Sequence, residues 1–257
     1  MHLMSAQHSL KTRTPDHYKK IVAVHDSIQN VARDNNLSTP TLFGGAAILF
    51  YVTPARFRVD SNVPTRDIDY IIPAEDSPKW EQACGITFSG GEAPGDMGSA
   101  KFIYKGTEVE FYANPAFTFH DHFSQVQFSF NLADFPPRVV TIGDTSAEVA
   151  HPALQLAFKL LLGRGIEKGK YDFEDAVALI EAADISGRAL KATLLHQKGF
   201  TTGHFKTIMA RLLECNRIGG SAKVKQLCNE FERALHSELN IGKISPHLRA
   251  VKRMVPV

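Results

Sequence analysis

The stretch PTRDIDYII, residues 64–72, decides how the fold of this 257-residue chain is interpreted. From Asp67 onward it alternates two carboxylates with apolar residues and then becomes wholly apolar. Successive side chains of a β-strand point to opposite faces, so Asp67 and Asp69 would share one face while Ile68 enters the core. Two carboxylates held rigidly in this way offer the oxygen ligands that Mg²⁺ prefers. The stretch therefore predicts a strand that presents an acidic pair.

A glycine pair lies upstream of this strand. Thr41 to Phe43 is typical of a short strand, Gly44 and Gly45 mark a sharp turn, and residues 46–52 suit a buried helix, although their periodicity also allows a strand. Backbone amides without a side chain can approach phosphate oxygens closely, and a following helix N-terminus adds a favourable field. We expect this turn to cradle a triphosphate.

A second acidic strand is expected downstream. Residues 101–105 and 107–113 flank Gly106 and are rich in aromatic and β-branched residues, which predicts a hairpin. Its second strand would carry Glu108 and Glu110 on one face. A third carboxylate could bind the metal or take the proton from an attacking hydroxyl, and Glu110 is the better-placed candidate, with Glu108 as the alternative.

The pattern of elements predicts an α+β fold, in which a mixed sheet with flanking helices is followed by a C-terminal helical bundle. An opening helix is expected over residues 15–36, and strands dominate up to about Ala150. We therefore place an α/β domain at 1–150 and a helical domain at 151–257. Helices in the second part are expected at 153–162, 172–183, 187–196, 203–215 and 221–238.

Composition narrows the class of protein but names no partner. Apolar residues make up 44% and charged residues 22% of the chain, and the net charge of +2 permits a nucleic-acid partner without arguing for one. The three cysteines form no CxxC pair, so neither a disulfide framework nor a zinc knuckle is indicated. No signal peptide and no apolar run of about 18 residues is visible. We expect a soluble cytoplasmic protein.

A series of phenylalanines lies between the two parts of the chain. Their alternation in a strand-rich region favours core packing over a base-stacking surface. The series comprises Phe117, Phe119, Phe123, Phe128, Phe130 and Phe135.

In order, these motifs resemble the polymerase-β-like nucleotidyltransferase superfamily, and within it the abortive-infection-type group that includes toxins of type IV toxin–antitoxin systems. The resemblance covers about residues 38–182. The matching stretches are LFGGAAILF (42–50), PTRDIDYII (64–72), EVEFY (108–112), AFKLLLGR (157–164) and KYDFEDAVALI (170–180).

The resemblance implies a nucleotidyltransferase fold and a set of site residues. The nucleotide contacts would be Gly44, Gly45, Thr65 and Arg66. The ligands of Mg²⁺ or Mn²⁺ would be Asp67, Asp69 and Glu110. The catalytic residues would be these three carboxylates together with Lys159 and Asp172.

The chemistry of Lys159 and Asp172, the two site residues in the helical half, is consistent with these roles. A lysine that points into the cleft would neutralise triphosphate charge, and Asp172 could orient it or act as a base. The alternative is that Lys159 extends along the edge of its helix to solvent.

The implied activity is transfer of a nucleoside monophosphate from an NTP, such as ATP, to an acceptor hydroxyl. The acceptor would be an RNA end, such as that of tRNA, or a protein, with a small molecule as a further possibility, and an antitoxin protein would be a partner. The chain departs from the pattern in a long segment at 46–66 and in Val63, where an arginine is common; Arg56, Arg58 or Arg66 could substitute. These departures motivate a competing hypothesis, a noncatalytic binding or regulatory module.

Overall fold

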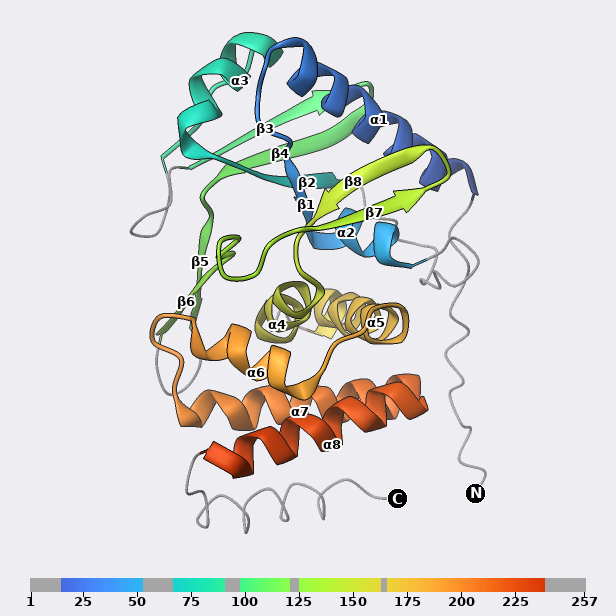
Figure 1. Cartoon of the computed structure of the whole chain (residues 1–257), viewed down its shortest axis with the longest axis vertical. Helices are drawn as coiled ribbons and strands as arrows, with labels where there is room; N and C mark the ends of the chain where they lie inside the picture. The colour runs from blue at the N-terminus through green and yellow to red at the C-terminus, as the bar shows by residue number, and fades with distance from the viewer. Residues whose placement is uncertain (1–14, 53–66, 91–97, 121–124, 163–165, 239–257) are drawn as a thin grey trace.

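The computed structural model describes residues 15–52, 67–90, 98–120, 125–162 and 166–238 (Figure 1). Thr65 and Arg66, which are expected to bind nucleotide, lie outside these residues, as does Val63. Arg56, Arg58 and Phe123 lie outside them too. The described part of the chain folds into a mixed sheet with helices on both faces, followed by a stack of helices, so the predicted α+β class is confirmed.

A six-stranded sheet forms the upper half of the molecule in Figure 1, in the order β3-β4-β2-β1-β8-β7. It is mixed, because β2 runs parallel to β4 and β1 runs parallel to β8, while the other neighbours are antiparallel. The strands are β1 (Thr41–Phe43), β2 (Asp67–Ile72), β3 (Ser99–Tyr104), β4 (Thr107–Ala113), β7 (Arg138–Ile142) and β8 (Thr145–Val149).

Helices α1 (Pro15–Asp34) and α3 (Ser77–Cys84), the latter preceded by a 3₁₀ turn (Ala74–Asp76), cover one face of the sheet (Figure 1). The apolar side chains of β2 and β4 that alternate with the carboxylates form this core. Ile68, Val109 and Trp80 are all completely buried in it. The prediction that Ile68 faces the core is confirmed.

The other face of the sheet is turned towards the helical half. The side chains of Phe43 and Ile71 point from this face and share a hydrophobic core with the helices that follow. Because this core joins side chains from both parts of the chain, the two parts pack as neighbours, and a domain boundary near residue 150 stays a prediction.

Helix α2 (Gly44–Tyr51) lies between the sheet and the helical half. It begins at Gly44 itself, so the strand β1 passes into the helix without an intervening loop. The helix prediction for this segment is confirmed, with a start two residues earlier than expected.

A two-stranded sheet, β5 (Ala116–His120) and β6 (Gln125–Ser129), extends from the main sheet down beside the helices in Figure 1. Phe128 and Phe130 are buried, and the ring centroid of Phe158 lies 5.6 Å and 5.2 Å from theirs. Phe117 lies 4.9 Å from the same ring. The aromatic series therefore packs in the core wherever the structure describes it.

Within the described ranges, five helices form the lower half, with α4 and α5 next to the sheet and α7 and α8 farthest from it (Figure 1). Helix α5 begins six residues before the expected Asp172, while the other bounds differ from the prediction by four residues or fewer. None of the described helices is both long and apolar enough to cross a membrane. The helices are α4 (Pro152–Leu162), α5 (Ile166–Ala182), α6 (Gly187–Leu195), α7 (Thr202–Gly219) and α8 (Ala222–Glu238).

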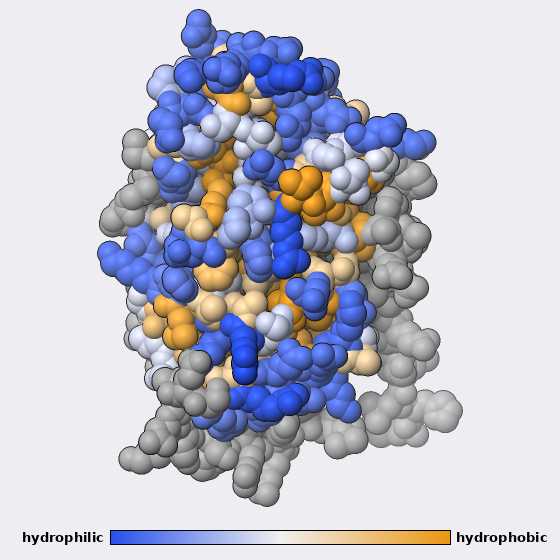
Figure 2. All heavy atoms as spheres, viewed as in Figure 1, coloured by the Kyte–Doolittle hydropathy of each residue, from blue (hydrophilic) through white to orange (hydrophobic). Residues whose placement is uncertain are grey.

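The surface seen in Figure 2 is mainly hydrophilic at its upper and lower ends, with apolar residues exposed around the middle. Cys84, Cys215 and Cys228 form no disulfide, and Cys215 and Cys228 are buried, as expected for small apolar residues of the core.

Candidate active site

The carboxylates of β2 and β4 lie on one face of the sheet. The parallel register places Asp67 opposite Glu108 and Asp69 opposite Glu110. Neighbouring strands are about 4.8 Å apart, so each pair brings two acidic side chains together. The predicted acidic face is present. The first residue of α2, Gly44, lies next to it because β1 is the neighbour of β2 in the sheet.

Gly44 lies directly against Asp69. Phe43, the last residue of β1, is paired with Asp69, so the next residue must pass over that carboxylate. Gly44 has φ +69°, and a Cβ at this position would lie 2.3 Å from the Asp69 Oδ2 atom. Glycine is therefore required twice, by its left-handed backbone and by the absence of space.

The electrostatic environment of Asp69 is that of a carboxylate crowded by others. Burial, and then the negative charges of Asp67 and Glu110, raise the pKa of Asp69 to about 8, while the charges of Lys159 and Lys101 lower it. A divalent cation would relieve this repulsion. The donor set therefore has the chemistry that Mg²⁺ or Mn²⁺ needs.

The third carboxylate has contacts of its own. Glu110 accepts a hydrogen bond of 3.1 Å from the Ser99 hydroxyl, and Glu108 forms an ion pair of 2.6 Å with Lys101. Within the described ranges, no three Asp, Glu, His or Cys side chains are arranged to hold a metal ion. Mg²⁺ commonly takes one or two carboxylates and completes its shell with water and substrate oxygens. The residues therefore fit a cation on Asp67 and Asp69, with Glu110 beside it.

The hydroxyl of Tyr112 lies close to the same carboxylates. Its hydroxyl is hydrogen-bonded to Glu110, and burial together with the charges of Asp69, Glu110 and Asp67 raises the pKa of Tyr112 above its ordinary value. Three carboxylates thus act on one hydroxyl. Between the two glutamates, Glu110 is the one in register with Asp69, whereas Glu108 is engaged by Lys101.

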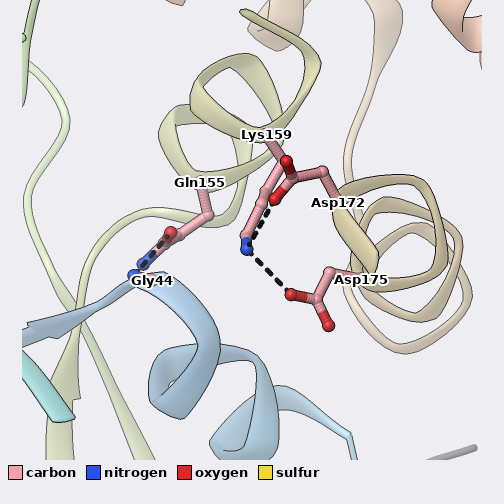
Figure 3. A network of polar contacts seen from close by, with 5 residues as sticks. All are labelled: Gly44, Gln155, Lys159, Asp172 and Asp175. Carbon is pink, nitrogen blue, oxygen red and sulfur yellow. Dashed lines mark hydrogen bonds and ion pairs between the residues drawn. The ribbon is translucent and has the colours of Figure 1, made fainter. Parts of the chain in front are cut away.

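The helical half contributes a buried lysine. Lys159 is 7% exposed, and its ammonium lies 3.2 Å from the Asp172 Oδ1 atom and 2.8 Å from the Asp175 Oδ2 atom (Figure 3). A buried ammonium needs such partners, because burial without them is strongly unfavourable. The alternative that Lys159 extends to solvent is wrong.

Asp175 was not among the site residues expected from the sequence. It lies three residues after Asp172 on α5, so both carboxylates share one helical face, and this spacing was the available signal.

The two halves meet at Gly44. The Gly44 amide donates a hydrogen bond of 3.2 Å to the Gln155 side-chain oxygen, and Gln155 lies four residues before Lys159 on α4 (Figure 3). The charge of Lys159 also acts on Asp69. The structure thus brings Gly44, Asp69 and Lys159 into one neighbourhood.

No protein-family model matches the chain, and no curated protein matches it. Nine solved chains do match. The chain is similar to solved nucleotidyltransferase-like proteins.

Three of these structures show the extent of the similarity. An antigenic nucleotidyltransferase-like protein from Paracoccidioides brasiliensis is 15% identical, with a TM-score of 0.44 over 83% of this chain and 94% of that one. A putative nucleotidyltransferase from Thermotoga maritima is 14% identical, with a TM-score of 0.40 over 64% and 94%. The antibiotic-resistance factor ANT(2'')-Ia is 14% identical, with a TM-score of 0.46 over 77% and 98%. Similarity at this level concerns the fold, and the activity depends on the residues of the site.

Proposed function

We propose that this protein is a metal-dependent nucleotidyltransferase of the polymerase-β-like kind, which transfers a nucleoside monophosphate from an NTP to an acceptor hydroxyl. The observation that carries the proposal is the contact between Gly44 and Asp69. It puts the first residue of α2 against a carboxylate that is in register with Glu110. An anion-binding helix N-terminus beside an acidic cluster is what a metal-bound triphosphate requires.

Each residue has a task in this reaction. Asp67 and Asp69 would hold Mg²⁺ or Mn²⁺, which supplies charge neutralisation for the phosphates. Gly44 and Gly45 would form the backbone turn that receives the phosphate oxygens, and Gly45 would donate its amide to them, because the Gly44 amide is donated to Gln155. Glu110 would accept the proton of the acceptor hydroxyl. The hydroxyl oxygen would form a bond to the α-phosphorus while the bond from this phosphorus to the bridging oxygen breaks and pyrophosphate leaves.

Lys159 would place a positive charge next to the triphosphate. Asp172 and Asp175 hold the ammonium in the interior, so its position is fixed before substrate arrives. Preorganised charge is effective because it needs no rearrangement during the reaction.

The resemblance in the motifs extends the proposal to the abortive-infection-type group. The substrate would be an NTP such as ATP, and the acceptor an RNA end, including tRNA, or a protein hydroxyl. The protein would then act in the cytoplasm as the toxin of a toxin–antitoxin pair and be bound by an antitoxin protein.

Two observations favour a second candidate, a noncatalytic module with this fold. Glu110 is hydrogen-bonded to Ser99, and the described acidic side chains are not arranged as a three-ligand metal site. A binding module would keep NTP affinity without transfer.

The test incubates the purified protein with each labelled NTP, Mg²⁺ and total RNA, and then separates RNA, protein and small molecules. Asp69→Asn replaces the proposed metal-binding carboxyl by an amide of the same size, and Asp144→Asn, at an exposed position in the β7–β8 turn, is the matched control. If one fraction is labelled by the wild type and by Asp144→Asn but not by Asp69→Asn, the result would support transferase activity and identify the acceptor. No label with any NTP, together with measurable NTP binding, would instead support the binding module.

A further inference from the structure

Gln155 is the uncharged polar residue of α4 that faces the proposed triphosphate site, beside the charged Lys159. It lies one helical turn before Lys159, so both side chains leave the same side of the helix. Figure 3 shows the two side chains pointing from α4 towards the start of α2. Gln155 is completely buried.

The orientation of its carboxamide is fixed by Gly44. A backbone amide can only donate, so Gln155 must present its oxygen to Gly44, at 3.2 Å. The side-chain nitrogen of Gln155 then points elsewhere. Among the residues that the structure describes, this buried nitrogen has no hydrogen-bond partner.

A buried donor without an acceptor is unfavourable and rare in native proteins. The rest of α4 is apolar apart from Lys159, so an apolar side chain would be the expected occupant of position 155. The helix α2 also has no side-chain cap from its N-cap residue Phe43, and the first-turn amides of a helix have no partners within it. Among the described residues, the buried nitrogen of Gln155 therefore lacks an acceptor at the start of α2, and phosphate oxygens are acceptors only.

We propose that Gln155 is a triphosphate-binding residue, whose oxygen holds the Gly44 amide in place and whose nitrogen donates a hydrogen bond to a phosphate oxygen of the NTP. This inference rests on the proposed function. It adds a neutral donor to the site, next to the positive charge of Lys159. Because the hydrogen bond from the Gln155 nitrogen forms only when the triphosphate is present, this nitrogen contributes to substrate affinity and not to the stability of the free protein.

The test is calorimetric binding of α,β-methylene NTP analogues with Mg²⁺ to the full chain, with Mg²⁺ tripolyphosphate as a base-independent probe. Gln155→Met keeps the length of the side chain and removes both polar atoms. We expect Gln155→Met to weaken binding of both probes about tenfold or more, because a hydrogen bond to a charged group is lost. Its melting temperature should change little, since loss of the hydrogen bond from the Gly44 amide opposes removal of the unpartnered donor.

Gln155→Glu is the second variant, because it keeps the acceptor for Gly44 and replaces the donor by a negative charge. It should weaken binding at least as much. The matched control is Gln197→Met, since Gln197 is also buried but both ends of its carboxamide are bonded, to the Ser129 amide at 2.8 Å and the Thr193 carbonyl at 2.7 Å. It should lower the melting temperature and leave binding unchanged.

The outcomes separate this inference from the proposed function. If the wild type binds the probes and Gln155→Met binds them equally well, Gln155 is not a ligand, while the proposed function stands. Tighter binding by Gln155→Met would also overturn the inference and show that Gln155 competes with phosphate for the Gly44 amide. If the wild type binds no NTP analogue and no tripolyphosphate, the proposed function fails, and this inference fails with it.

Discussion

The backbone of Gly44 and the carboxylate of Asp69 are so close that a Cβ at position 44 would lie 2.3 Å from the Asp69 Oδ2 atom. This contact joins the N-terminus of α2 to the acidic strand β2, and it is possible only because residue 44 has no side chain. It therefore provides a sharp test of how the site is built.

Gly44→Ala should destabilise the protein and abolish nucleotide binding. The left-handed backbone costs about 1–2 kcal/mol for any L-residue, and the added methyl would also displace Asp69. Gly143→Ala is the matched control, because Gly143 has φ +58° but nothing within 4 Å of an added Cβ. Urea unfolding and NTP-analogue calorimetry measure both effects. Equal losses of stability and full binding in both variants would contradict the close contact.

The two glutamates of β4 should differ in their effect on transfer. Glu110 is in register with Asp69, whereas Glu108 is paired with Lys101. We expect Glu110→Gln to lower the rate about 100-fold or more, as for loss of a general base, and Glu108→Gln to lower it less than about tenfold. Initial rates of label transfer with saturating NTP measure this. The reverse order would assign the third position to Glu108.

Lys159→Met should be strongly destabilising. It leaves Asp172 and Asp175 without the ammonium that lies 3.2 Å and 2.8 Å from them, and removing one member of a buried ion pair costs about 3–5 kcal/mol. Adding Asp172→Asn and Asp175→Asn to this variant should restore much of the stability without restoring transfer.

The control for this series is an exposed ion pair. Arg217→Met removes a pair with Glu214 on the surface of α7, at 2.6 Å, and should change the free energy of unfolding by less than about 1 kcal/mol. Chemical unfolding of all these variants gives the comparison. A loss in Lys159→Met as small as in Arg217→Met would show that the buried pair contributes little.

Stability should fall at mildly acidic pH because of His25. Burial lowers the pKa of His25 from 6.5 to about 4, so the unfolded chain binds a proton that the folded chain does not. His25 contributes its full stability above about pH 6.5, and this contribution is lost as the pH falls towards 4. At pH 5 the expected loss is on the order of 2 kcal/mol.

His25→Gln should remove this part of the pH dependence, and His196→Gln, at an exposed histidine, should leave it. Urea unfolding at pH 7.5 and pH 5 is the measurement. Parallel losses in wild type and His25→Gln would assign the acid sensitivity to other groups.

Much of the fold could be predicted from local patterns. The alternation in Asp67 to Ile72 predicted both the strand and the face of its two carboxylates, and the hairpin around Gly106 was predicted in the same way. These features depend on the period of a single element, which neighbouring residues determine. The start of α5 at Ile166 could not be predicted in this way, because its first turns lack a clear apolar pattern.

The sequence by itself determined the strand at 67–72, the hairpin around Gly106, the acidic face of β2 and β4, and the need for glycine at the β1–α2 junction. Only the tertiary structure decided that Gln155 meets Gly44 across 111 residues, and that Lys159 is buried against Asp172 and Asp175. A periodic pattern shows which face of an element is apolar, but not which other element covers that face. Such contacts depend on how the helices pack on the sheet, and the packing is determined by the whole core at once.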